Sequence, residues 1–168
     1  QMSETSLYGQ ELSWGFLDAL GQTYNSSFLD MKYKNSASYK YTDYYVKPIV
    51  ETIWERMYNS IANCNNIIQR IEIESVNLFE DGKNERDVIK GEALALRAYL
   101  HFDILRLFAP SMKKDDGKNY VPYVETYPCK FQPYTTNKEV IEKTIADLKK
   151  AKELVGPFDT ADVKWMTT

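Results

Sequence analysis

The pattern of apolar positions is strongest between residues 84 and 109, where it predicts a helix with two apolar faces. At ~3.6 residues per turn, one apolar stripe runs from Ile89 to Leu107 and a second, on the opposite side, runs from Leu94 to Ala109. A helix on the surface of a protein needs only one apolar face. We therefore expect this helix to be central, with neighbours packed on both sides of it.

Three other segments show helical periodicity and have residues that fit a helix end. We expect helices at about residues 3–23, 48–72 and 136–155. Pro48 suits the first turn of a helix, where its missing N–H costs nothing. Thr136 and Glu139 have the spacing of a capping box, and Asn84 is expected to cap the central helix.

Two long segments between the helices lack periodicity and are rich in aromatic residues. Residues 24–46 and 111–135 are interrupted by turn-forming residues and prolines, so we expect loops there. A middle helix buried on two faces predicts an all-α fold, a tetratricopeptide-like helical array of the α-solenoid type with two long aromatic loops. No clean repeat of ~34 residues is present, so this likeness is one of architecture. We expect a single domain over residues 1–168, and a piece of a longer chain because the last helix has no successor.

Composition and charge exclude several classes of protein. A hydrophobic content of 43% and a charged content of 27% are typical of a soluble globular protein. The net charge of −3 offers no basic stripe for phosphates, which argues against binding of nucleic acid. No apolar run approaches the ~20 residues of a membrane span, and no secretory segment is present. Cys64 and Cys129 are expected to be unpaired thiols, the alternative being a disulfide.

The sequence offers no catalytic or metal-binding constellation. His101 is the only histidine, and its place within the central helix favours a packed structural role over that of a general base. Asp103 and Arg106 are three residues apart on the same helix, which favours an ion pair over an acid/base pair. Phosphate-binding loops and hydrolase motifs are absent. We therefore expect a protein that is not an enzyme and that uses neither a cofactor nor a metal.

Tyrosine is the outlier in the composition. Ten of the 13 tyrosines lie in residues 24–45 and 120–134. Long loops often carry function, and a tyrosine ring offers a flat face for stacking under a sugar and a hydroxyl for its rim. The alternative is that these rings pack the loops onto the helices. The candidate aromatic platform for a ligand consists of Tyr33, Tyr39, Tyr41, Tyr44, Tyr123 and Tyr127.

The central helix also resembles a known family. The signature GEA…RA…yfdL…rlfG of the SusD/RagB family is similar to this chain at Gly91-Glu92-Ala93, Arg97-Ala98, Phe102-Asp103 and Arg106-Leu107-Phe108. The resemblance extends to three more segments: Trp54, Tyr58, Ile61, Asn65 and Ile67-Ile68; Val121-Pro122-Tyr123; and Glu139-Val140 through Asp147-Leu148, Ala151 and Leu154. The chain departs from the pattern at Ala109, where glycine is usual.

The resemblance covers nearly all of this chain but only the N-terminal part of a family member. It implies a lipoprotein of the Gram-negative outer membrane that binds a glycan at the cell surface and delivers it, without catalysis, to a SusC-like TonB-dependent transporter. The lipid anchor would lie outside this sequence. No binding residue transfers from the family, so the aromatic platform rests on tyrosine clustering alone. The alternative, from a different class, is a tetratricopeptide-like scaffold for protein–protein interaction.

Overall fold

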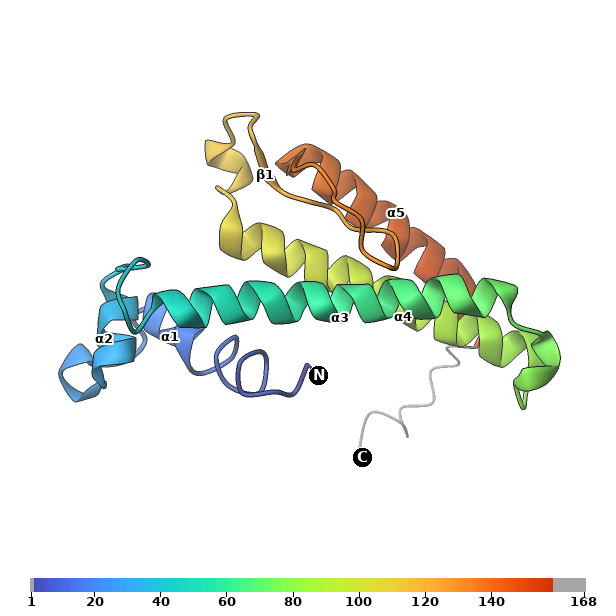
Figure 1. Cartoon of the computed structure of the whole chain (residues 1–168), viewed down its shortest axis with the longest axis horizontal. Coiled ribbons are helices and arrows are strands. Elements are labelled where there is room, and N and C mark those ends of the chain that lie inside the picture. The colour runs from blue at the N-terminus through green and yellow to red at the C-terminus, as the bar shows by residue number, and fades with distance from the viewer. Residues whose placement is uncertain (1, 159–168) are drawn as a thin grey trace. The chain divides into compact units, whose positions relative to one another are not determined.

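The computed structural model describes residues 2–158 of the chain, and this part is mainly helical (Figure 1). Its α-helices are α1 (Phe16–Leu20), α2 (Met31–Ala37), α3 (Lys47–Ile73), α4 (Gly82–Phe108) and α5 (Asn137–Val155). The strands β1 (Asn119–Val121) and β2 (Thr135–Thr136) pair antiparallel, and short 3₁₀ turns lie at Ser26–Phe28, Val76–Leu78 and Met112–Lys114. The predicted all-α class is confirmed, whereas the α-solenoid arrangement stays a prediction.

The chain divides into two compact units, Gln1–Ser60 and Ile61–Thr168, and the boundary between them falls within α3. The prediction of one domain over residues 1–168 stays a prediction. Cys64 is buried and Cys129 is exposed, and both thiols are free, as expected. Among the described residues, no helix is long and apolar enough to cross a membrane.

The three long helices follow the predicted bounds within one or two residues. At the start of α5 the Thr136 hydroxyl accepts a hydrogen bond from the backbone N–H of Glu139 at 3.3 Å, as a capping box requires. The predicted cap at Asn84 is wrong, because α4 begins two residues earlier at Gly82. Gly82 has a φ of +55°, which glycine adopts without steric cost, so the turn is made there and Asn84 lies inside the helix.

The predicted helix over residues 3–23 is wrong except for the short α1. The preceding residues form wide turns, in which backbone N–H groups bond to carbonyl oxygens five or six residues earlier, as Leu12 does to Leu7 (2.9 Å). Gly9 allows these wide turns, because it has no side chain and a Cβ at this position would lie 2.3 Å from the carbonyl oxygen of Ser3. Leu7 and Leu12 are nevertheless buried. The apolar pattern thus predicted the burial of Leu7 and Leu12 correctly, but Trp14 and Leu17 are exposed, and the residues before α1 form turns instead of a helix.

The predicted loop over residues 24–46 contains the helix α2. Asp30 caps it, since its carboxylate accepts a hydrogen bond from the backbone N–H of Tyr33 at 3.0 Å. Aspartate is among the best residues at this position, so the sequence did contain the signal for this helix. The second predicted loop, over residues 111–135, is largely irregular apart from a 3₁₀ turn and the pairing of β1 with β2.

In the second unit α4 packs against α5, and Ile68 places the C-terminal half of α3 against it as well. Most residues of both predicted apolar stripes are buried, although Phe102 is 42% exposed. Figure 1 shows α4 and α5 side by side. Ile68, Ala93, Leu94 and Ala151 from the three helices form one apolar cluster. Gly91 allows α4 and α5 to approach closely, because a Cβ there would lie 2.5 Å from a methyl carbon of Val155.

Candidate functional site

A buried polar network in the second unit joins α3, α4 and α5 to the segment that follows β1. Arg97 Nε and Nη2 donate to the two carboxylate oxygens of Asp147, each at 2.7 Å, and Arg97 Nη1 donates to Asn65 Oδ1 at 2.8 Å. Asp147 also accepts a hydrogen bond from the Tyr123 hydroxyl at 2.7 Å. All four side chains are buried. Burial acts to lower the pKa of Arg97, but the hydrogen bonds and charge of Asp147 raise it, so the guanidinium stays charged.

His101 has both of its ring nitrogens engaged. Nε2 accepts a hydrogen bond from the backbone N–H of Val124 at 2.9 Å, and Nδ1 lies 3.0 Å from the carbonyl oxygen of Arg97. Because a carbonyl only accepts, Nδ1 carries the proton and the ring is neutral. The ring stacks on Tyr123 with centroids 3.9 Å apart. Burial lowers the pKa of His101 to about 3. The predicted structural role of this histidine is confirmed.

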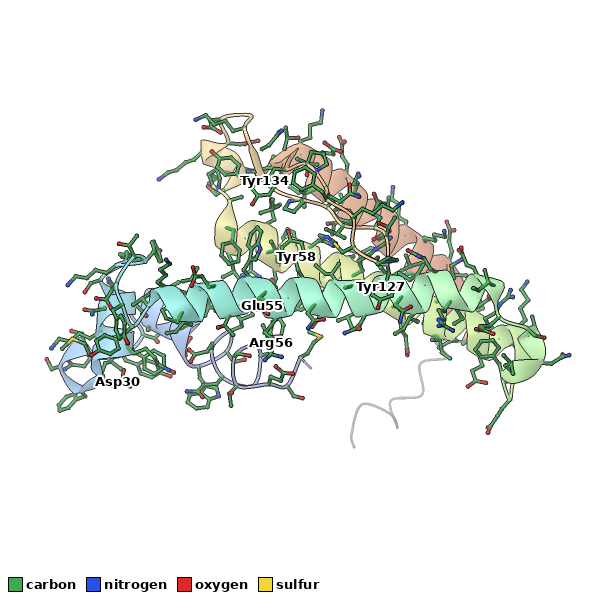
Figure 2. The ribbon with its side chains drawn as sticks, viewed as in Figure 1. Asp30, Glu55, Arg56, Tyr58, Tyr127 and Tyr134 are labelled. Carbon is green, nitrogen blue, oxygen red and sulfur yellow. The ribbon has the colours of Figure 1, made fainter. Side chains whose placement is uncertain are left out.

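Polar side chains of α3 and α4 form hydrogen bonds with the backbone of the segment after β1 and so hold it in place. Val124 donates its N–H to His101, and its carbonyl accepts a hydrogen bond from Asn65 Nδ2 at 3.0 Å. Three residues later the Gln69 amide binds both backbone groups of Tyr127, at 2.6 and 2.7 Å, beside α3 (Figure 2). The path of this segment is thus set by long-range hydrogen bonds rather than by its own secondary structure.

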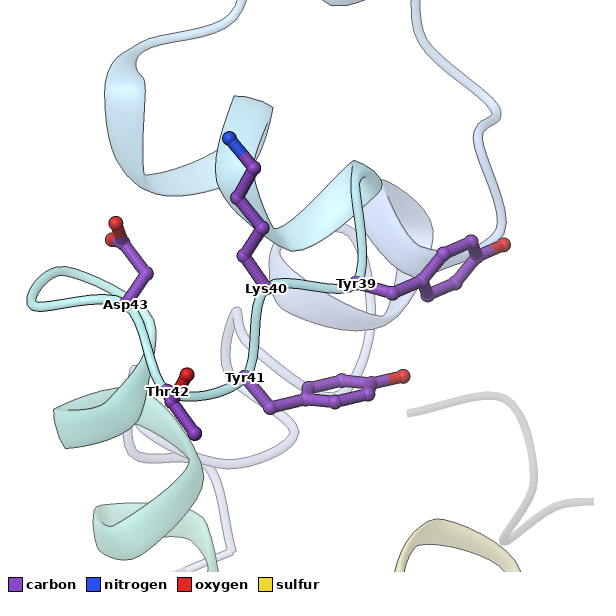
Figure 3. Close-up of a pocket in the computed structure, with 5 residues that line it drawn as sticks. All are labelled: Tyr39, Lys40, Tyr41, Thr42 and Asp43. Carbon is purple, nitrogen blue, oxygen red and sulfur yellow. The ribbon is translucent and has the colours of Figure 1, made fainter.

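In the first unit the structure brings two of the predicted platform residues together. The rings of Tyr39 and Tyr41 have centroids 6.4 Å apart and planes inclined by 53°, and their side chains are 51% and 49% exposed. Together with Lys40, Thr42 and Asp43 they line an open hollow of about 420 Å³. Figure 3 shows both rings projecting to the same side of the turn. We refer to Tyr39 and Tyr41 as the tyrosine pair.

The turn that carries the tyrosine pair is locally strained. Tyr39 has a φ of +54°, in the left-handed region that bulky residues rarely adopt. Two side-chain hydrogen bonds hold this turn: the Tyr39 hydroxyl donates to the carbonyl of Leu20 (3.1 Å), and Gln22 Nε2 donates to the carbonyl of Ala37 (3.1 Å). Strained backbone of this kind costs about 1–3 kcal/mol and concentrates at functional sites. The strain therefore favours a functional role for this turn.

Tyr33 and Tyr44 lie in the same unit but in different surroundings. The Tyr33 hydroxyl accepts a hydrogen bond from Gln10 and donates to Glu11, and the Lys32 ammonium covers one ring face at 4.2 Å from the centroid. Tyr44 is 83% exposed and meets the neighbouring Tyr45 ring edge-on. Tyr33 is thus part of a polar cluster, whereas Tyr44 presents its ring to solvent.

Tyr123 and Tyr127 belong to the second unit. Tyr123 is almost completely buried, and burial together with its hydrogen bond to Asp147 raises the pKa of its hydroxyl. Its ring is stacked on His101 and only 2% of the residue is exposed, so it presents no ring face to solvent. Tyr127 is 44% exposed. Tyrosine clustering in the sequence could not separate these cases, because both residues lie in the same proline-rich segment.

Comparison with known proteins identifies the family. A SusD-like family model, described as starch-binding associating with outer membrane, matches residues 10–165. The chain belongs to the SusD-like family. No curated protein and no solved structure matches it.

In this SusD-like chain the buried network joins the four segments that carry the sequence resemblance. Each segment contributes one side chain to it: Asn65, Arg97, Tyr123 and Asp147. Gly91 of the same signature lies at the contact of α4 with α5, where a Cβ would lie 2.5 Å from a methyl carbon of Val155. Sequence reasoning on its own did not pair Arg97 with Asp147, because 50 residues separate them. Both residues nevertheless belong to the motifs that carry the family resemblance.

Proposed function

We propose that this chain captures a glycan at the outer-membrane surface and delivers it, without catalysis, to a SusC-like TonB-dependent transporter. The family match over residues 10–165 carries this proposal, and its description makes starch the first polysaccharide to test. We propose further that the chain is the N-terminal helical portion of a longer protein, held at the cell surface by a lipid anchor outside this sequence.

The tyrosine pair supports a glycan-binding role. Two half-exposed rings on one side of a fixed turn can stack against the C–H faces of sugar units, while the Tyr41 hydroxyl can reach a rim. Lys40, Thr42 and Asp43 line the same hollow and offer hydrogen-bonding groups to sugar hydroxyls. The volume of about 420 Å³ lies within the ~300–1,000 Å³ range of small-molecule sites. Ligand contact through Tyr33, Tyr44 and Tyr127 stays a prediction.

The environment of the titratable residues supports a role without catalysis. The only histidine, His101, is buried with both ring nitrogens bonded to backbone groups, so it is in no position to exchange protons with a ligand. Asp103 accepts a hydrogen bond from Arg106 at 2.9 Å, which is the ion pair that their spacing predicts. These groups stabilise helices rather than forming an acid/base pair.

Affinity electrophoresis tests the proposal directly. The purified chain would be run in native gels that contain starch or one of a panel of other soluble polysaccharides. The double variant Tyr39→Ala/Tyr41→Ala removes the tyrosine pair, and Phe131→Ala is a matched control that removes a 95% exposed ring from the second unit. We expect retardation by at least one polysaccharide that the double variant loses and the control keeps.

The other outcomes of the electrophoresis separate the function from the site. Retardation that survives in the double variant would keep glycan binding and refute the tyrosine pair as the site. No retardation by any polysaccharide, with a helical circular dichroism spectrum to show that the chain is folded, would contradict glycan binding. That result would favour the tetratricopeptide-like scaffold. Delivery is tested separately, by co-purification of the native protein with a TonB-dependent transporter from outer-membrane extracts.

A further inference from the structure

A second cavity in the first unit is lined mainly by polar side chains. Its volume is about 360 Å³, and it shares no residue with the hollow at the tyrosine pair. The polar lining residues are Thr5, Ser6, Gln10, Glu11, Lys32 and Thr52. They come from the wide turns before α1, from α2 and from the first turns of α3. Pro48 and Ile49 add an apolar wall.

A buried carboxylate organises this cavity. One oxygen of Glu11 accepts hydrogen bonds from the Lys32 ammonium at 3.0 Å and the Tyr33 hydroxyl at 3.2 Å. The other accepts the backbone N–H of Phe16 at 2.9 Å. Gln10 completes the cluster, since its Nε2 donates to the Tyr33 hydroxyl at 2.8 Å. The polar groups at the cavity wall are therefore held in place before any ligand arrives, which lowers the entropic cost of binding.

The remaining groups of the lining are available for hydrogen bonds. Among the described residues, the hydroxyl groups of Thr5, Ser6 and Thr52 have no hydrogen-bond partner, and each can both donate and accept. The charges of Glu11 and Lys32 cancel at 3.0 Å, so the cavity has no net charge to offer an ionic ligand. This combination suits an uncharged molecule that carries several hydroxyl groups on a partly apolar ring.

We infer that this cavity is a second subsite that binds one neutral hexose unit of a glycan. The inference rests on the proposed function, since it takes sugar as the ligand, and it adds a polar subsite to the stacking surface of the tyrosine pair. Its volume lies at the small end of the ~300–1,000 Å³ range of ligand sites, which fits a single sugar ring. With about 12 non-hydrogen atoms and ordinary ligand efficiency, a free hexose should bind with a Kd on the order of 1 mM.

Nuclear magnetic resonance of the ¹⁵N-labelled chain tests the subsite. Glucose, galactose and mannose would be titrated in turn, with glucuronate as an anionic control. We expect saturating shifts of the backbone amides around Ser6, Gln10 and Thr52 with at least one neutral hexose. Thr52→Val removes one hydroxyl at nearly constant volume and should weaken binding about fivefold. Thr126→Val, the matched control, removes the hydroxyl of an exposed threonine in the second unit that lines neither hollow, and should leave these shifts unchanged.

A second variant keeps the test independent of a single hydroxyl. Ile49→Trp places a larger ring at the apolar wall of the cavity and should abolish the shifts, with circular dichroism confirming an unchanged fold. Shifts that persist in Ile49→Trp, an absence of shifts at the cavity, or an equal response to glucuronate would each overturn the subsite. Retardation by a polysaccharide in the gels above would then still uphold the proposed function. Shifts at the cavity without any such retardation would support the hexose site and contradict polysaccharide capture.

Discussion

Removal of the Asp147 carboxylate is predicted to destabilise the second unit strongly. Asp147→Ala takes away three hydrogen bonds of 2.7 Å, two from Arg97 and one from Tyr123. The Arg97 guanidinium, whose residue is only 6% exposed, is then left buried without an anionic partner. Breaking a buried ion pair from one side costs about 3–5 kcal/mol, because the remaining charge cannot regain its hydration. We expect a loss of that size in the free energy of unfolding.

Urea unfolding followed by circular dichroism at 222 nm measures this loss. Thermal unfolding gives a second measure. For a chain of this length, each kcal/mol of lost stability lowers Tm by about 2–4 °C, so Asp147→Ala should lower Tm by roughly 6–20 °C. Glu142→Ala on the same helix is the matched control. Glu142 pairs with Lys138 at 3.8 Å, and both side chains are more than 60% exposed, so that pair should contribute less than about 0.5 kcal/mol.

A second variant separates the penalty of a lone charge from the loss of packing. Arg97→Met/Asp147→Leu removes both charges and keeps apolar volume, and buried pairs replaced in this way often lose little stability. The double variant should therefore be more stable than Asp147→Ala. The reasoning is refuted if Asp147→Ala costs no more than Glu142→Ala, or if the double variant is no more stable than the single one.

Gly91→Ala should lower the free energy of unfolding by about 1–3 kcal/mol, because the new Cβ would lie 2.5 Å from a Val155 methyl carbon; Val155→Ala should restore most of this in urea unfolding. The pKa of His101 is about 3 in the folded chain and about 6.5 when unfolded, so its contribution to stability is complete above pH 6.5 and lost as pH falls toward 3. The free energy of unfolding should therefore be about 2 kcal/mol lower at pH 5 than at pH 7, and the His101→Gln variant should lack this part of the pH dependence. Tyr39→Phe removes the bond to the Leu20 carbonyl but keeps the ring for stacking, and Gln22 still holds the turn through the Ala37 carbonyl, so most of the retardation by polysaccharide should remain.

Each of these three predictions has a result that contradicts it. Gly91→Ala with the stability of the parent chain would mean that α4 and α5 separate at little cost. A parent and a His101→Gln variant with the same stability profile between pH 5 and 7 would mean that this histidine is not held neutral. Complete loss of retardation in Tyr39→Phe would mean that the stacked ring is not sufficient and that the hydroxyl is required, either for binding or for holding the turn.

The sequence by itself determined where the long helices lie and most of the apolar residues that they bury, although Phe102 of α4 and Leu148 of α5, on the same stripes, are 42% and 45% exposed. The apolar stripes of α3, α4 and α5 repeat with the period of the helix, and this is a local property that neighbouring residues set among themselves. The same period failed before α1, where it marked the buried residues Leu7 and Leu12 but not the wider turns. Glycine at position 9 permits those turns, and they depend on backbone hydrogen bonds that periodicity does not report.

Only the tertiary structure decided what the polar and aromatic residues do. Arg97 meets Asn65 and Asp147, which are 32 and 50 residues away in the chain, and no local pattern specifies such partners. The same holds for the tyrosines: clustering marked the segments, but distant hydrogen bonds hold the rings of Tyr33, Tyr39 and Tyr123. Tyr123 is drawn inward by Asp147, whereas Tyr39 is held at the surface by the carbonyl of Leu20. Local periodicity therefore determined the three long helices, and long-range polar contacts determined the candidate site.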